Sequence, residues 1–199
     1  MDYVTSRANE LLPCSYCGVL RRKALHEGAR RLGATKLATA HNLDDEVQTA
    51  LLNMMHGDVE RILPTLGIAT EAPAGFVPRI KPLADVPERE TTLYAYASGT
   101  RFQTTPCPHG HDALRGDIRL MLNRLELKRP GLKYTVSRSV ERLSAAATGI
   151  NGERRVFRTC KVCGDPTPND VCEACLMLRA LKTRRGIACE GAALVDRSA

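Results

Sequence analysis

Apolar residues recur every three or four positions in several stretches of the chain, as expected for helices with one buried face. In the first stretch Leu25, Ala29 and Leu32 lie at this spacing. Gly33 follows them and is placed as a helix terminator. The same pattern predicts helices over residues 17–32, 44–55, 85–98, 112–128 and 135–147.

A short apolar run at 36–40 lies between the first two predicted helices and is typical of a buried strand. The order helix, strand, helix predicts an α/β unit with its loops at the carboxyl edge of a parallel sheet. Residues 64–87 are rich in Pro and Gly and predict a surface loop. Asp85 then has the position of a helix N-cap, with Pro87 in the first turn and Glu88 three residues on.

The composition, 43% hydrophobic and 26% charged residues, is that of a globular protein and excludes a wholly disordered chain. Lys and Arg (29) exceed Asp and Glu (22), for a net charge of +7, which often marks a polyanion partner. Aromatic residues make up only 4%, so phosphate contacts should outweigh base stacking. No membrane span and no secretion signal are found, so a soluble cytoplasmic protein without a membrane partner is expected.

The chain has eight cysteines, a number that fits either disulfides or metal sites. Disulfides need an oxidising compartment, which nothing in this sequence indicates. Six of the eight stand in C-x-x-C pairs, the usual presentation of thiolates to a metal. Cys189 stands alone and is interpreted as a free thiol.

The C-terminal cysteines have the sharper spacing. Two C-x-x-C pairs with eight residues between them supply four thiolates for a tetrahedral metal, namely Cys160, Cys163, Cys172 and Cys175. Gly164 suits a knuckle in which a residue with positive φ turns backbone amides toward sulfur. The pattern predicts a structural zinc site, closed to substrate because all four positions are filled.

A second set of cysteines is less regular. Cys14 and Cys17 directly precede a helical pattern, and Cys107 lies far along the chain between two prolines. Three thiolates can hold an iron–sulfur cluster and leave one iron open. The spacing is equally compatible with a redox C-x-x-C, or with zinc bound with the help of His109 or His111.

Polar residues gather where the predicted strand turns into the second helix. His41, Asp44 and Asp45 lie there, at the expected carboxyl edge of the sheet. Two adjacent carboxylates at this place suit metal–phosphate binding or acid–base chemistry. Plain capping of the helix N-terminus by acidic residues is the simpler alternative.

Five ordered motifs together resemble a known family: CSYCGVLRRKAL, TAHNLDDEVQT, VPRIKPL, TTPCP followed by ALRGDIR, and TCKVCGDPTPNDVCEAC. They are similar to the cytosolic-type tRNA uridine 2-thiolation enzymes of the PP-loop (N-type ATP pyrophosphatase) superfamily. The form CGVLRR looks closer to the wobble-uridine branch than to the branch acting on the T-loop uridine. The resemblance implies an α/β fold, a partial adenine-nucleotide alpha-hydrolase-like (PP-loop) domain with several helices plus a small C-terminal zinc ribbon.

The resemblance also implies a reaction and its residues. ATP with Mg would adenylate the C2 oxygen of a tRNA uridine, and sulfur from the thiocarboxylate of a ubiquitin-like carrier protein would then displace AMP. Cys14, Cys17 and Cys107 match the family's ligands of a 4Fe-4S cluster with one open iron. Asp45 matches the catalytic acid and Arg21 the catalytic basic residue. Because Arg does not release its proton at physiological pH, Arg21 would stabilise negative charge.

Other residues are candidates for contacts around this centre. On the nucleotide or metal side these are His41 and Asp44, and for the tRNA they are Arg22, Lys81 and Arg115. A homodimer is compatible with the resemblance. The expected division is a PP-loop portion at 1–147, a linker at 148–157, the zinc ribbon at 158–183 and a flexible tail at 184–199.

The opposing interpretation is a non-catalytic RNA-binding protein with a zinc ribbon. Basic side chains serve both interpretations and also fit a solvated face. Cys107 separates them, because a binding module has no use for a third sulfur ligand together with Cys14 and Cys17.

The chain departs from the family in one respect. Members carry an N-terminal zinc module and a pyrophosphate-binding SGGKDS loop, and no Gly-rich phosphate loop is found in this sequence. The sequence therefore looks like the C-terminal portion of the enzyme. We predict that this polypeptide alone gives no ATP-dependent thiolation of tRNA, measured as 2-thiouridine in digested tRNA. Thiolation by the isolated chain would contradict this.

Overall fold

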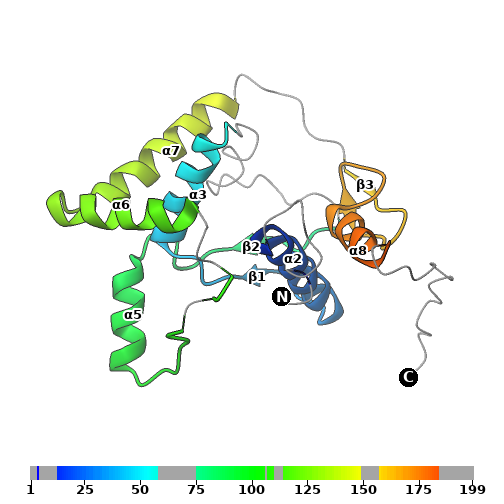
Figure 1. Ribbon diagram of the computed structural model, residues 1–199, viewed down its shortest axis with the longest axis horizontal. Helices are drawn as coiled ribbons and strands as arrows, with labels where there is room; N and C mark the ends of the chain where they lie inside the picture. The colour runs from blue at the N-terminus through cyan, green and yellow to red at the C-terminus, as the bar shows by residue number, and fades with distance from the viewer. Residues whose placement is uncertain are drawn as a thin grey trace. The chain divides into compact units, whose positions relative to one another are not determined.

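The computed structural model describes residues 4, 13–57, 75–105, 107–109, 114–148 and 157–183 (Figure 1). Its elements are α2 (Pro13–Arg31), β1 (Leu37–Ala38), α3 (Leu43–Met55), β2 (Arg79–Ile80), α5 (Glu88–Ala97), α6 (Leu114–Lys128), α7 (Leu132–Thr148), β3 (Arg158–Thr159), β4 (Pro166–Thr167) and α8 (Glu173–Thr183). None of the described helices is long and apolar enough to cross a membrane.

The chain forms two compact units, one of Met1–Leu25 with Val156–Ala199 and the other of His26–Arg155. The sequence-based division instead kept 1–147 together, and its boundaries stay a prediction. The difference arises at the N-terminal end, where residues of α2 share a core with the C-terminal module. Residues 149–156 of the predicted linker and the predicted tail at 184–199 lie outside the described residues.

Helix packing forms the core of the unit His26–Arg155. Leu43 and Val47 on α3 meet Ile118 and Leu122 on α6, and all four are at most 2% exposed. The helix α7 packs on the same helix α3 through Val136 and other side chains (Figure 1). The apolar stripe that the sequence predicts for residues 44–55 is therefore the face around which this unit forms.

The helix ends agree with the glycine signals. Gly33 and Gly99 have φ of +62° and +67° and lie two residues after the last residues of α2 and α5. This left-handed conformation suits glycine and stops a helix, because other residues adopt it only with strain. α2 begins at Pro13, ahead of the predicted start at residue 17.

A parallel pair of short strands lies in the same unit. β1 pairs with β2 in the register Leu37↔Arg79 and Ala38↔Ile80. Two predictions were wrong here. The segment 64–87 is not only a loop, since it holds β2, and β1 is not buried, since Leu37 is only half-buried and Ala38 exposed. Prolines on both sides of β2 are the reason that the sequence did not predict a strand there, because proline is rare within strands.

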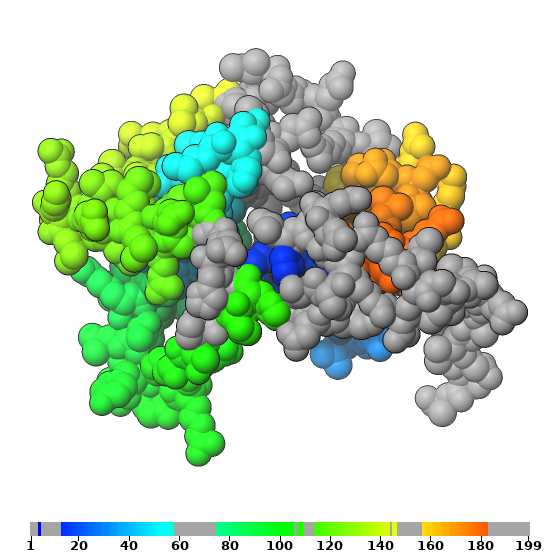
Figure 2. Space-filling model, in the orientation of Figure 1, coloured from blue at the N-terminus to red at the C-terminus, as the bar shows by residue number. Residues whose placement is uncertain are grey.

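The start of α5 also differs from its prediction. Asp85 is exposed, and the N-cap is Pro87, which makes no side-chain capping bond. A carboxylate does reach this helix end, but it belongs to α3: Asp44 Oδ2 accepts the backbone N–H of Glu88 at 2.8 Å. α5 itself buries no residue and extends away from α3, α6 and α7 (Figures 1 and 2).

The other unit has a core of its own. Tyr16 of α2 packs with Val4 against Met177 and Leu181 of α8, and Val19 joins this cluster. The antiparallel pair β3–β4 completes the described C-terminal module. The first turns of α2 thus share apolar side chains with α8, although 150 or more residues separate them along the chain.

We predict that Leu122→Ala lowers the free energy of unfolding of the chain by about 3 kcal/mol, because it leaves a cavity between α3 and α6. Leu120→Ala, on the same helix but 69% exposed, should change it by less than about 0.5 kcal/mol. Urea unfolding followed by circular dichroism measures both. Equal effects of the two substitutions would contradict this packing.

Candidate functional site

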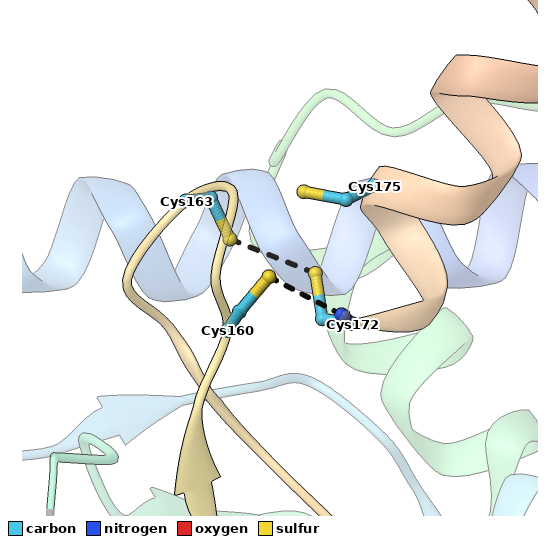
Figure 3. Close-up of side chains that lie close together, drawn as sticks. All are labelled: Cys160, Cys163, Cys172 and Cys175. Atoms are coloured by element: carbon cyan, nitrogen blue, oxygen red, sulfur yellow. Dashed lines mark hydrogen bonds between the residues drawn. The ribbon is translucent and has the colours of Figure 1, made fainter. Parts of the chain in front are cut away.

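The four cysteines of the C-terminal module converge on one point (Figure 3). Cys160 and Cys163 come from the turn after β3, and Cys172 and Cys175 from the start of α8. Their sulfur atoms all lie within 4.8 Å of one another. Four sulfurs around a tetrahedral metal at 2.3 Å stand about 3.8 Å apart. The Cys163–Cys172 sulfur distance of 3.6 Å fits this, so the predicted four-cysteine set can hold a metal ion.

Backbone groups hold the first pair of cysteines in a knuckle. Gly164 has φ +76°, the positive value that the sequence predicts there, and its N–H donates to the carbonyl of Cys160 at 3.0 Å. The N–H of Cys172 donates to Cys160 Sγ at 3.2 Å, and the N–H of Cys160 donates to the carbonyl of Asp165 at 2.8 Å. The sulfur positions are thus set by the chain itself.

The pKa values of three of these thiols are shifted in different directions. Burial opposes ionisation of Cys160, but the backbone N–H groups of Cys172, Cys163 and Val162 outweigh it and lower its pKa to about 6. Burial raises the pKa of Cys163 and that of Cys175. Since a metal binds thiolates and displaces their protons, its affinity must fall as the pH falls.

A lysine from α2 approaches the same knuckle. Lys23 Nζ lies 2.5 Å from Asp165 Oδ2, and both side chains are largely buried, at 19% and 13% exposed. Burial acts to lower the pKa of Lys23, but its bonds to Asp165 and Cys163 raise it above its ordinary value. The sequence reasoning missed Lys23, because its partner Asp165 lies 142 residues away.

The N-terminal C-x-x-C pair, Cys14 and Cys17, lies on α2, in the same compact unit as the four-cysteine site. Cys14 and Arg21 are exposed and Cys17 is half-buried. Spacings of three and four residues put the three side chains on one helix face. Cys107 is exposed and belongs to the other compact unit.

The three-cysteine cluster site therefore stays a prediction. Of its alternative ligands, His109 is half-buried. His111 lies outside the described residues, as does Cys189.

The acidic residues at the start of α3 have distinct surroundings. Asp45 forms a capping box with Asn42: the Asp45 N–H donates to Asn42 Oδ1 at 3.0 Å, and the Asn42 N–H donates to Asp45 Oδ2 at 3.1 Å. The capping alternative is thus present in the structure. His41 lies beside them with Nδ1 2.9 Å from Thr39 Oγ1, and burial lowers the pKa of His41.

Asp44 is a buried partner in an ion pair. It is 3% exposed, and Lys133, 8% exposed, donates from Nζ to its Oδ1. Lys133 also donates to Asn123 Oδ1 at 2.7 Å, and Asp44 Oδ2 receives the N–H of Glu88. Both oxygens of Asp44 accept bonds from the protein itself, an arrangement typical of a structural role. Its role toward nucleotide or metal stays a prediction.

Two of the three candidate tRNA contacts are held by α3. Lys81 Nζ lies 2.6 Å from Glu46 Oε2, and Arg115 donates to Gln48 Oε1 and Thr49 Oγ1 at 3.2 and 2.9 Å. Arg22 is exposed on α2 and donates to the carbonyl of Gly18 at 2.9 Å. A tRNA contact through these residues stays a prediction, with Arg22 the most exposed of the three.

Comparison with known proteins gives a consistent set of relatives. No family model matches the chain. The tRNA 2-thiolation protein NcsA of Haloferax volcanii is 39% identical over 189 residues, which cover 91% of this chain and 59% of that protein. The cytoplasmic tRNA 2-thiolation protein 1 of Saccharomyces cerevisiae is 34% identical, covering 100% of this chain and 57% of that protein.

A solved structure agrees with the sequence relatives. It is the U34-tRNA thiolase NcsA from Methanococcus maripaludis with its [4Fe-4S] cluster, at a TM-score of 0.69 and 34% identity, covering 86% of this chain. The chain is a homologue of the tRNA 2-thiolation proteins. The resemblance inferred from the five motifs and the α/β fold class are thereby confirmed. This homologue spans between 54% and 59% of the lengths of these three relatives.

We predict that Asp44→Asn lowers the free energy of unfolding of this 2-thiolation homologue by about 3 kcal/mol, because it leaves the Lys133 charge buried without its partner. Lys133→Met should cost a similar amount, and the double substitution less than the sum of the two. Urea unfolding of the three variants measures this. Asp45→Asn, which alters only the capping box, should cost about 1 kcal/mol or less. An unchanged unfolding midpoint in Asp44→Asn would contradict a structural ion pair.

Proposed function

We propose that this chain carries the sulfur-transfer part of an enzyme that 2-thiolates uridine in tRNA, at the wobble position. The observation that supports it most is the 39% identity to a tRNA 2-thiolation protein over 91% of the chain. The solved relative with a TM-score of 0.69 is described as a U34-tRNA thiolase. ATP with Mg and a ubiquitin-like sulfur carrier are its proposed co-substrate and sulfur source.

Cys14, Cys17 and Cys107 are the proposed ligands of a 4Fe-4S cluster. The relative with a [4Fe-4S] cluster supports this, as does the presentation of Cys14 and Cys17 on one face of α2. When bound by three thiolates, such a cluster offers an iron with an open position for sulfur. Four cysteines would close that position, so the two-plus-one set is the one suited to sulfur transfer.

Two further residues have proposed catalytic roles. Arg21 is exposed one turn beyond Cys17 on the same face of α2, where a permanent positive charge can stabilise phosphate or a developing anion. Asp45, half-buried at the start of α3, is the proposed acid. The adjacent His41 stays largely neutral near pH 7, because burial lowers its pKa, so it would act as a hydrogen-bonding group on the nucleotide side.

The C-terminal four-cysteine module is proposed to bind zinc in a structural role. Its sulfurs lie within 4.8 Å of one another, and a site of four thiolates has no position left for substrate. A zinc ribbon at 158–183 beside a PP-loop portion at 1–147 is the proposed domain organisation. The net charge of +7 supports tRNA as the partner, and a cytoplasmic location and a homodimer belong to the same proposal.

Metal analysis of the chain tests this function. We predict that anaerobic reconstitution with iron and sulfide gives about four irons per chain with the absorption of a 4Fe-4S cluster. Cys107→Ser should lose the iron and keep its zinc. Cys189→Ser is the matched control, since Cys189 belongs to neither proposed ligand set, and it should keep both metals.

The same measurement separates the two functional classes. A wild-type chain that binds zinc but no iron, and that shifts tRNA in a gel, would identify an RNA-binding protein with a zinc ribbon. Iron bound equally by wild type and Cys107→Ser would rule out the two-plus-one site.

A further inference from the structure

The helix α2 presents two different faces. With about 100° per residue, Cys14, Cys17 and Arg21 fall within about 60° of one another. Tyr16, Val19 and Lys23 form a second group of the same width, about 160° around the helix from the first. Exposure agrees with this division: Cys14 and Arg21 are exposed, whereas Tyr16 is buried.

The second face is bound to the C-terminal module. Tyr16, the residue next to Cys17, packs against Met177 and Leu181 of α8, and Val19 packs beside it. One turn further on, Lys23 forms its ion pair with Asp165. Three contacts in a row on one side of a helix fix its rotation about its own axis, and that rotation determines where the opposite face points.

The partner residues are in turn fixed by the four-cysteine site. Asp165 directly follows the knuckle of Cys163 and Gly164, and its carbonyl accepts the N–H of Cys160. Met177 lies on the first turns of α8, just after Cys175. A metal that binds all four thiolates therefore locks both the loop that carries Asp165 and the helix that carries Met177.

We propose that the metal-bound C-terminal module positions the Cys14–Cys17 pair, with Tyr16 and Lys23 as the positioning residues. This inference rests on the proposed function, because it concerns how the cluster ligands of that function are held. It gives the four-cysteine site a task beyond its own folding. Iron binding at the Cys14–Cys17 pair then depends on the metal in the four-cysteine site, whereas the four-cysteine site does not depend on iron.

That asymmetry is the first test. Cys160→Ser should lose zinc and, with it, most of the iron bound on anaerobic reconstitution. Cys107→Ser should lose iron and keep zinc. If Cys160→Ser lost its zinc and still bound iron as the wild type does, the inference would be overturned while the proposed function stood. A wild type without iron would instead overturn the proposed function.

The second test leaves all cysteines in place. Lys23→Met should keep its zinc. After desalting, its iron content should be about half that of the wild type or lower, as expected when a residue that supports the ligands is lost. Arg31→Met is the matched control, because it breaks an exposed ion pair with Glu27 on the same helix and should leave both metals unchanged. Full iron in a zinc-loaded Lys23→Met variant would overturn the role of Lys23.

A readout that needs no iron completes the design. Hydrogen exchange of the full chain, measured with zinc and after removal of zinc by a chelator, should show lost protection at residues 13–25 of α2. The helices α6 and α7, in the other compact unit, serve as internal reference and should keep their protection. Unchanged exchange at residues 13–25 after zinc removal would overturn the positioning role.

Discussion

The rotation of α2 about its axis is the constraint on which the candidate site depends. The helix carries cysteines on one side and, on the other, the aromatic ring and the ammonium group that meet the C-terminal module. A rotation by one residue would turn both cysteines about 100° away from their direction. Burial of Tyr16 opposes such a rotation, but the hydrophobic effect has no preferred direction. The hydrogen-bonded ion pair of Lys23 with Asp165 joins two specific groups and so favours one rotation of the helix.

In the other unit, α3 joins an apolar side to a polar side. Leu43 and Val47 anchor the helix core, while three of its polar side chains each hold a cation from another segment: Asp44 holds Lys133, Glu46 holds Lys81 and Gln48 holds Arg115. Buried charges are tolerated here because each is matched by an opposite charge or by hydrogen bonds. The first two turns of α3 are thus a structural junction as well as the proposed place of chemistry.

The sequence was sufficient for features that depend on neighbours along the chain. Helical spacing, with the glycines at 33 and 99, predicted α2, α3, α5, α6 and α7 but not α8, and two C-x-x-C pairs predicted the four-cysteine site. Long-range partners were not predictable. The sequence around Asp44 does not predict its partner Lys133, which lies 89 residues away, and the sequence around Lys23 does not predict Asp165. β2 escaped because two paired residues between prolines carry no alternating pattern.

The helix α5 depends on a cap that another helix supplies. Ten residues with no buried side chain form a helix that is marginal in water on its own, since the cost of its first turn is not repaid by packing. Its first N–H, at Glu88, is held by Asp44, and the Glu88 side chain is held by Arg119 of α6. Neighbouring helices therefore stabilise the first turn of α5. This helix should unfold together with the start of α3, so loss of α5 would indicate that the contacts at the start of α3 are broken.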